Sequence, residues 1–185
     1  LPKAPVEPGL AHRPGGRELY AYLTRGHTTT DLTPDQIHQI GLSEVARIRA
    51  RMDVEMKASG WTGDFAGFLA FLRSDPQFYA QTREDLIEKA SEMAKRADGG
   101  LPALFGTLPR LPYDVIPVPA QLEENYTTGR YNLGSMQNGA PGHYVVNTSK
   151  LDQRPLYELP ALTLHEAVPG HHVQIALQKE AEDQP

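Results

Sequence analysis

A proline-glycine pair inside an otherwise helical segment limits most strongly how this chain can fold. The segment 156–182 reads LYELPALTLHEAVPGHHVQIALQKEAE and carries apolar residues at roughly helical spacing. Pro160 suits the first turn of a helix, whereas Pro169 stands in the interior, where proline removes a hydrogen bond and clashes with the carbonyl four residues back. We therefore predict one helix over 156–182 that is interrupted at Pro169 and Gly170.

Three histidines and a glutamate flank this predicted interruption: His165, Glu166, His171 and His172. In an ideal helix the step from His165 to His171 corresponds to about 600° of rotation and about 9 Å of rise, too far for two bonds of about 2.0–2.1 Å to one zinc ion. A bulge that extrudes about two residues would return His171 to the face of His165. His172 would need three extruded residues, so it is the second choice for the same position.

Composition restricts what such a cluster can bind. The chain has no cysteine, so a metal must be held by His, Asp or Glu. A helix interior gains nothing from so many imidazoles, which favours a metal site over the alternative that all three histidines are ordinary core or surface residues. The candidate ligands of this site are His165 with His171 or His172, and Glu166 is the candidate acceptor of a proton from water. Isolated histidines are more often ordinary core or surface residues, which is our interpretation of His12, His27, His38 and His143.

Charge and hydropathy exclude several other classes of partner. The net charge is −5, and no basic stripe indicates binding to nucleic acid. No apolar run has the length of a membrane-spanning segment. The chain lacks an initial Met and ends just after the histidine cluster, so we expect it to be an internal piece of a longer protein.

Helix signals dominate the first part of the chain, and we expect a helical scaffold over 17–108. Thr33, Pro34 and Gln36 form the pattern of an N-cap, a first-turn proline and a capping-box partner, and predict a long helix that ends near Ser59. Thr82 predicts the cap of a further helix that Gly99 should close. Shorter helices are expected over 17–25 and 65–72.

β-branched and aromatic residues between turn formers change the pattern over 109–150. Strands are predicted at 115–118 and 143–148, with a long polar loop between them, and nearby prolines should confine the first strand to a sheet edge. The whole chain, 1–185, is therefore expected to form a single domain that is mainly α, in the α+β class, with a small antiparallel sheet.

Three separated segments resemble the bacterial domain-of-unknown-function family 885, which is grouped with gluzincin-like metallopeptidases. They read TLHEAVPGHHVQIALQ, HTTTDLTPDQIHQIGLSEVARI and APGHYVVNTSKL, and the resemblance covers nearly all of the chain. It implies a helix-rich, zincin-like catalytic domain with its sheet beside the active-site helix. The family's motif falls on His165 and Glu166 and on Pro169 to His172, and it implies a third ligand beyond residue 185. It also implies a periplasmic or lipoprotein-anchored location.

Two functional interpretations follow. The first is a zinc-dependent hydrolase of peptide bonds, in which the strand with Tyr144, Val145, Val146 and Asn147 pairs with the backbone of a peptide substrate. The alternative is a non-catalytic helical binding module with a structural metal or none. The sequence leaves open the metal, the choice between His171 and His172, the substrate and the oligomeric state.

Overall fold

A computed structural model of the protein describes residues 9–181. The chain divides into two compact units, with the boundary between Phe68 and Leu69. The boundary falls inside helix α3 (Phe65–Ser74), so no proline- or glycine-rich linker marks it in the sequence.

The first unit contains α1 (Gly16–Thr28), α2 (Pro34–Ala58) and the start of α3. The predicted capping box of α2 is confirmed. The Thr33 hydroxyl accepts a hydrogen bond from the Gln36 main-chain N–H at 3.2 Å, and the Gln36 side chain accepts one from the Thr33 N–H at 2.8 Å. Six large apolar side chains of α2 are exposed, whereas Met56 is buried; the exposed ones are Ile40, Leu42, Val45, Ile48, Met52 and Val54.

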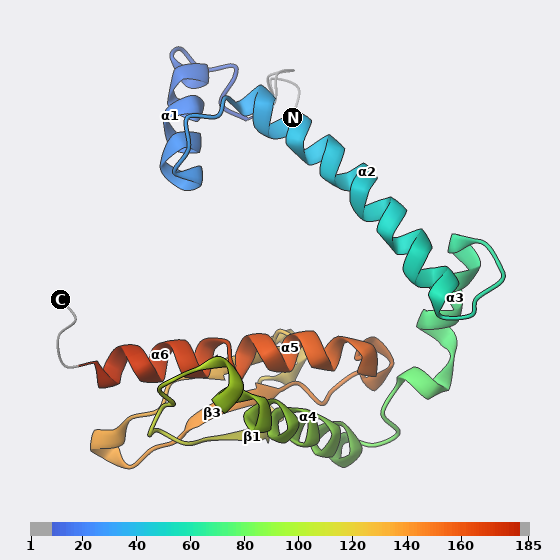
Figure 1. The fold of residues 1–185 in the computed structure, drawn as a ribbon, viewed down its shortest axis with the longest axis vertical. Helices are drawn as coiled ribbons and strands as arrows, with labels where there is room; N and C mark the ends of the chain where they lie inside the picture. The colour runs from blue at the N-terminus through green and yellow to red at the C-terminus, as the bar shows by residue number, and fades with distance from the viewer. Residues whose placement is uncertain (1–8, 182–185) are drawn as a thin grey trace. The chain divides into compact units, whose positions relative to one another are not determined.

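The second unit combines helices with a small sheet, which confirms the predicted mainly α, α+β class (Figure 1). Its regular elements are α4 (Arg83–Leu104), β1 (Tyr113–Pro117), β2 (Gly129–Asn132), β3 (Gly142–Val146), α5 (Leu159–Glu166) and α6 (His171–Glu180). Among residues 9–181, no helix combines the length and the apolarity needed to cross a membrane.

Helix α4 begins as the sequence predicted but ends later. The Thr82 hydroxyl accepts a hydrogen bond from the Asp85 N–H at 3.0 Å, as an N-cap should. The expected end at Gly99 is wrong, because the helix continues to Leu104. Leu101 is buried against Val168 and Val173, and this packing overrides the weak helix preference of the glycines.

The sheet is mixed and not antiparallel throughout, which corrects the prediction. Its strand order is β1-β3-β2, with β2 antiparallel to β3 and β1 parallel to β3. The polar loop expected between the two predicted strands contains β2, and the chain reverses direction on either side of it, so β1 and β3 point the same way. Strand β1, which ends at Pro117 and is flanked by Pro112 and Pro119, lies at an edge, as predicted.

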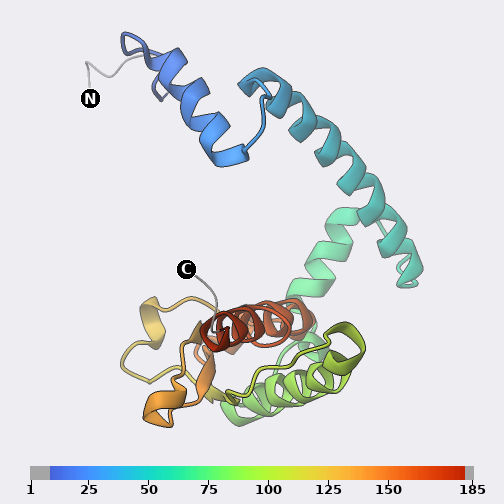
Figure 2. The ribbon, with the colours of Figure 1, turned by 60° about the vertical axis from the view of Figure 1, so that its left-hand side comes forward.

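The core of this unit lies between the sheet, α4 and α5. Figures 1 and 2 show α4 beside the nearly collinear pair α5 and α6, with the strands close by. Tyr144 and Val146 of β3 lie among apolar side chains of both helices and the segments that lead into them. The buried members of this cluster are Ala80, Leu86, Ala90, Tyr144, Val146, Leu159 and Ala167. Strand β3 therefore fixes the position of α5, which carries His165 and Glu166.

Candidate metal centre

The predicted interruption of the C-terminal helix is confirmed. Helix α5 ends at Glu166 and α6 begins at His171, with a cis peptide bond between Val168 and Pro169. Two main-chain hydrogen bonds bridge the gap, from the Gly170 N–H to the Leu164 carbonyl at 2.9 Å and from the His172 N–H to the Ala167 carbonyl at 3.1 Å. The first spans six residues where a regular helix spans four, so the chain accommodates two extra residues and resumes its helical course.

Only glycine fits at position 170, because any side chain there would clash with the main chain of α5. A Cβ atom built on Gly170 would lie 1.9 Å from the carbonyl oxygen of His165 and 2.6 Å from that of Leu164. Both obstacles are main-chain atoms, so no rotamer change can relieve the overlap. The absence of a side chain at position 170 therefore allows α6 to approach the end of α5.

The break brings together the side chains of His165, Glu166 and His171. One potential ligand atom from each lies within 4.8 Å of the others. The two imidazole rings meet edge to face, with centroids 4.7 Å apart and an interplanar angle of 87°. The Nε2 atom of His171 lies 3.9 Å from Oε2 of Glu166. His171 rather than His172 thus occupies the position beside His165.

This donor set fits a zinc ion. Two ligand atoms at about 2.0–2.1 Å from one tetrahedral ion lie roughly 3.3 Å apart, so the nitrogens of His165 and His171, which lie within 4.8 Å of each other, would need to approach by at most about 1.5 Å to share one ion. Imidazole nitrogens are ligands that zinc accepts, and the adjacent carboxylate can act either as a further ligand or as a proton acceptor. His165 is exposed and His171 is half-buried, which leaves the group accessible from solvent.

The Glu166 carboxylate is held by the neighbouring strand. Its Oε2 accepts a hydrogen bond from the Tyr131 main-chain N–H at 2.8 Å, and the residue is only 9% exposed. Tyr144 lies close to it in the core. Burial raises the pKa of Tyr144 to about 12, a hydrogen bond with Thr163 opposes this, and the negative charge of Glu166 adds to the increase. The Tyr144 phenol therefore stays protonated at neutral pH.

His172 points away from this group and into the protein. Its Nδ1 lies 2.9 Å from the Tyr131 hydroxyl, and its ring packs on Tyr113 with centroids 4.6 Å apart. Burial lowers the pKa of His172, although a main-chain hydrogen bond at Leu111 and the carboxylates of Asp98 and Glu180 oppose the shift. The sequence placed His172 among the candidate ligands, but the structure surrounds it with aromatic rings and main chain.

Strand β3 offers no free edge to a substrate, in contrast to the expectation for Tyr144, Val145, Val146 and Asn147. It lies between β1 and β2, so its main-chain groups already pair on both sides. Pairing continues just beyond the strand, where the Asn147 N–H donates to the Thr128 carbonyl at 2.9 Å. The sequence could not reveal this, because the short β2 was hidden in a polar loop.

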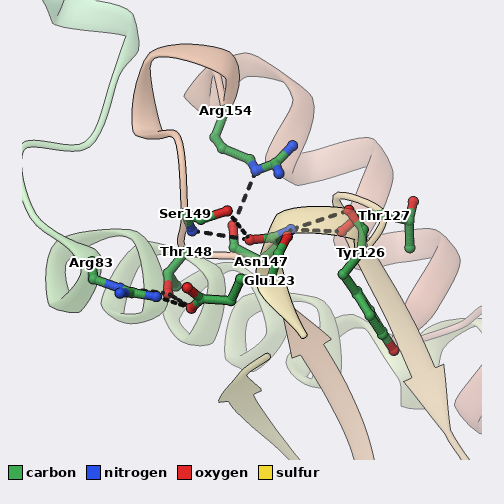
Figure 3. A network of polar contacts seen from close by, with 8 residues as sticks. All are labelled: Arg83, Glu123, Tyr126, Thr127, Asn147, Thr148, Ser149 and Arg154. Atoms are coloured by element: carbon green, nitrogen blue, oxygen red, sulfur yellow. Dashed lines mark hydrogen bonds and ion pairs between the residues drawn. The ribbon is translucent and has the colours of Figure 1, made fainter. Parts of the chain in front are cut away.

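Asn147 organises a loop network instead (Figure 3). Its side-chain N–H groups lie within hydrogen-bond distance of the carbonyls of Glu123, Tyr126 and Thr127, at 2.9, 3.2 and 3.3 Å. Its side-chain oxygen accepts hydrogen bonds from the main-chain N–H and the hydroxyl of Ser149. Asn147 is completely buried, so these contacts replace the water that it loses on folding.

Ionic contacts complete this network. Glu123, which is 8% exposed, forms an ion pair with Arg83 and accepts a hydrogen bond from the Thr148 hydroxyl. Arg154 donates to the Asn147 carbonyl at 3.2 Å. The chain before β2 is thereby tied to α4 and to the end of β3, which fixes the strand that contacts Glu166.

Replacing Asn147 with alanine is expected to lower the free energy of unfolding by at least about 1–3 kcal/mol, because carbonyl groups of the loop lose their donor. Thermal or urea unfolding measures the loss. The exposed Asn125, in the same loop, provides the matched control, and Asn125→Ala should stay within about 0.5 kcal/mol of the original protein. Equal stabilities of the two variants would contradict the organising role of Asn147.

Sequence reasoning missed Tyr131, whose main chain and side chain both reach the segment around the candidate centre. In the structure, buried and exposed residues alternate over Gly129-Arg130-Tyr131-Asn132 as in a strand, but the sequence itself gives only a weak sign of this, a tyrosine between two polar residues. Four residues within a glycine-rich polar segment were too short to identify. His143, interpreted as an isolated histidine, contacts Asp114 on the adjacent strand at 2.5 Å.

Comparisons with known proteins agree with the sequence resemblance. The family model for bacterial proteins of unknown function, DUF885, matches residues 1–185. The crystal structure of a "putative lipoprotein" from Colwellia psychrerythraea is similar, with a TM-score of 0.79 and 32% sequence identity. The alignment covers 91% of this chain and 30% of that one, so this chain spans under a third of that protein's length. No curated protein matches significantly. The chain belongs to the DUF885 family of bacterial proteins.

Proposed function

We propose that this protein contributes the metal-binding helix pair of a zinc-dependent hydrolase that acts on peptide bonds. The observation that carries the proposal is the convergence of His165, Glu166 and His171 to within 4.8 Å across a break in the helix. A surface helix needs neither the break nor the buried carboxylate. Gly170 supports the proposal because its close contact with the end of α5 leaves no room for a side chain, and that contact brings His171 beside His165 and Glu166.

In this proposal His165 and His171 hold the ion as neutral imidazoles. When bound, zinc supplies Lewis-acid chemistry, by which it polarises a carbonyl group and makes water more acidic near neutral pH. Glu166 accepts the proton of the attacking water and passes it to the leaving amine. The Tyr131 N–H bound to Oε2 orients the carboxylate for this transfer.

A third protein ligand is needed to complete the site in this role, because catalytic zinc sites commonly use three protein ligands and leave the fourth position to water. With Glu166 as the base, we assign the third ligand to a carboxylate outside residues 1–185. The relative from Colwellia psychrerythraea supports this, since 70% of its chain lies outside the aligned region. Zinc should therefore bind less tightly to the 185 residues alone than to the natural full-length protein.

Zinc titration tests the two histidine ligands. In the full-length protein, His165→Ala and His171→Ala should each weaken zinc binding by more than about 100-fold, since loss of a direct ligand exceeds the roughly 10- to 100-fold effect of losing a supporting group. Competition with a chromophoric chelator measures the dissociation constants, and hydrolysis of a peptide library measures activity in parallel.

His38, an exposed residue of α2, supplies the control. His38→Ala should bind zinc as the original protein does. Equal zinc affinity in all three variants would exclude the site. Tight zinc binding without hydrolysis of any peptide would favour the non-catalytic binding module with a structural metal. Tight binding by the 185-residue chain alone would remove the need for an external ligand.

A further inference from the structure

Tyr131 contacts both sides of the helix break through different groups of one residue. Its main-chain N–H donates to Oε2 of Glu166, at the end of α5, at 2.8 Å. Its hydroxyl lies 2.9 Å from Nδ1 of His172, in the first turn of α6. One residue of β2 thus bridges the carboxylate before the break and the helix after it, two parts that no regular helical hydrogen bond connects.

The Tyr131 side chain has a specific space beside β3. A Cβ atom on Gly142 would lie 2.2 Å from the Tyr131 hydroxyl and 2.8 Å from its ring. Tyr131 is 7% exposed, and its ring meets that of His172 with centroids 5.5 Å apart. The position of the hydroxyl is therefore set by packing against the sheet and not by a flexible contact at the surface.

His172 connects the first turn of α6 to Tyr131, so the position of Tyr131 constrains the orientation of that turn. Its main-chain N–H bonds to the Ala167 carbonyl inside the break, while its side chain is enclosed by Tyr131 and Tyr113. His171 precedes it and projects from α6 about 100° away around the helix axis. A rotation of the first turn of α6 would therefore move His171 relative to His165 and Glu166.

We propose that Tyr131 is a positioning residue of the candidate metal centre, which holds Glu166 with its main chain and the first turn of α6 with its hydroxyl. The inference rests on the proposed zinc site. It assigns to His172 the role of an anchor between α6 and the sheet, and it makes β2 the element that sets the separation between His171 and Glu166.

The test removes only the hydroxyl, by Tyr131→Phe in the full-length protein, and measures binding of Zn²⁺ and the visible spectrum of bound Co²⁺. Zinc affinity should fall about tenfold, at the low end of the loss for groups that orient metal ligands, and the Co²⁺ spectrum should shift because the ligand geometry changes. The matched control is Tyr113→Phe. Tyr113 also packs on His172, but its hydroxyl donates to Asp98 at 2.9 Å, so its loss should leave both metal readouts unchanged.

A second variant keeps every atom of Tyr131. Gly142→Ala should displace the hydroxyl and weaken Zn²⁺ binding in the same direction, with the unfolding midpoint of each apo variant recorded as a check on folding. Unchanged zinc affinity and Co²⁺ spectrum in folded Tyr131→Phe, beside tight binding by the original protein, would overturn the positioning role alone. Equal losses in the two Tyr→Phe variants would overturn it as well. Absence of zinc binding by the original protein would overturn the proposed function and this inference together.

Discussion

Replacing Gly170 with alanine is expected to abolish most of the zinc affinity of the full-length protein. The added Cβ would meet the His165 carbonyl oxygen at 1.9 Å, so the start of α6 must move away from α5. We expect a loss of more than about 100-fold in zinc affinity, because a ligand is displaced. The free energy of unfolding should fall by about 1–3 kcal/mol or more, as for other overpacked sites. Chelator competition and urea unfolding measure the two effects.

Gly99 provides the contrasting substitution. It lies in α4, is exposed, and has nothing within 4 Å of its ideal Cβ position. Gly99→Ala should raise the free energy of unfolding by about 0.5–1 kcal/mol, because alanine loses less backbone entropy in a helix, and should leave zinc binding intact. If Gly170→Ala behaved like Gly99→Ala, the close approach of α6 to α5 would not be needed for the site.

Glu166→Gln is expected to lower kcat/KM for peptide hydrolysis by about 10²- to 10⁴-fold while zinc remains bound. Glutamine preserves the side-chain shape and an oxygen that can accept the Tyr131 N–H, but it cannot accept a proton from water. The fall should appear mainly in kcat, since the lost interaction belongs to the chemical step. Steady-state kinetics and metal analysis of the same preparation provide the measurement.

The control is the same chemical change at the other end of α5. Glu158 is exposed and precedes the first residue of that helix, so Glu158→Gln should alter turnover by less than about twofold. Loss of zinc from Glu166→Gln would identify Glu166 as a ligand. Retention of both zinc and full turnover would leave Glu166 with a structural role, and would favour an unidentified base.

The sequence correctly predicted two helix boundaries that depend only on residues close together in the chain: the start of α2 and the break between α5 and α6. The capping box of α2 needs only Thr33 and Gln36, which are three residues apart, and it formed as predicted. The break between α5 and α6 also follows from local chemistry, because Pro169 cannot donate to a helical ladder wherever the helix packs. The position of β1 at the sheet edge follows from its prolines in the same way.

Tertiary packing decided where local preferences were weak. Helix α4 passes Gly99 because Leu101 finds a buried place against Val168 and Val173, which lie more than sixty residues later in the chain. The four residues of β2 had too little pattern to be recognised and form a strand by pairing with β3. That pairing removed the free edge expected at Tyr144 to Val146 and gave Asn147 a role in the loop.

At the candidate centre, too, local sequence determined one feature and tertiary packing another: the first is the helix break, and the second is which of His171 and His172 lies beside His165. The sequence alone determined that a proline-glycine break separates His165 and Glu166 from His171 and His172, because backbone chemistry imposes it locally. Only the tertiary structure decided which histidine faces outward. Tyr113 and Tyr131 enclose His172, so its neighbour His171 projects beside His165 and Glu166. Contacts between strands and a helix distant in sequence fix that rotation, and no spacing rule within the motif contains them.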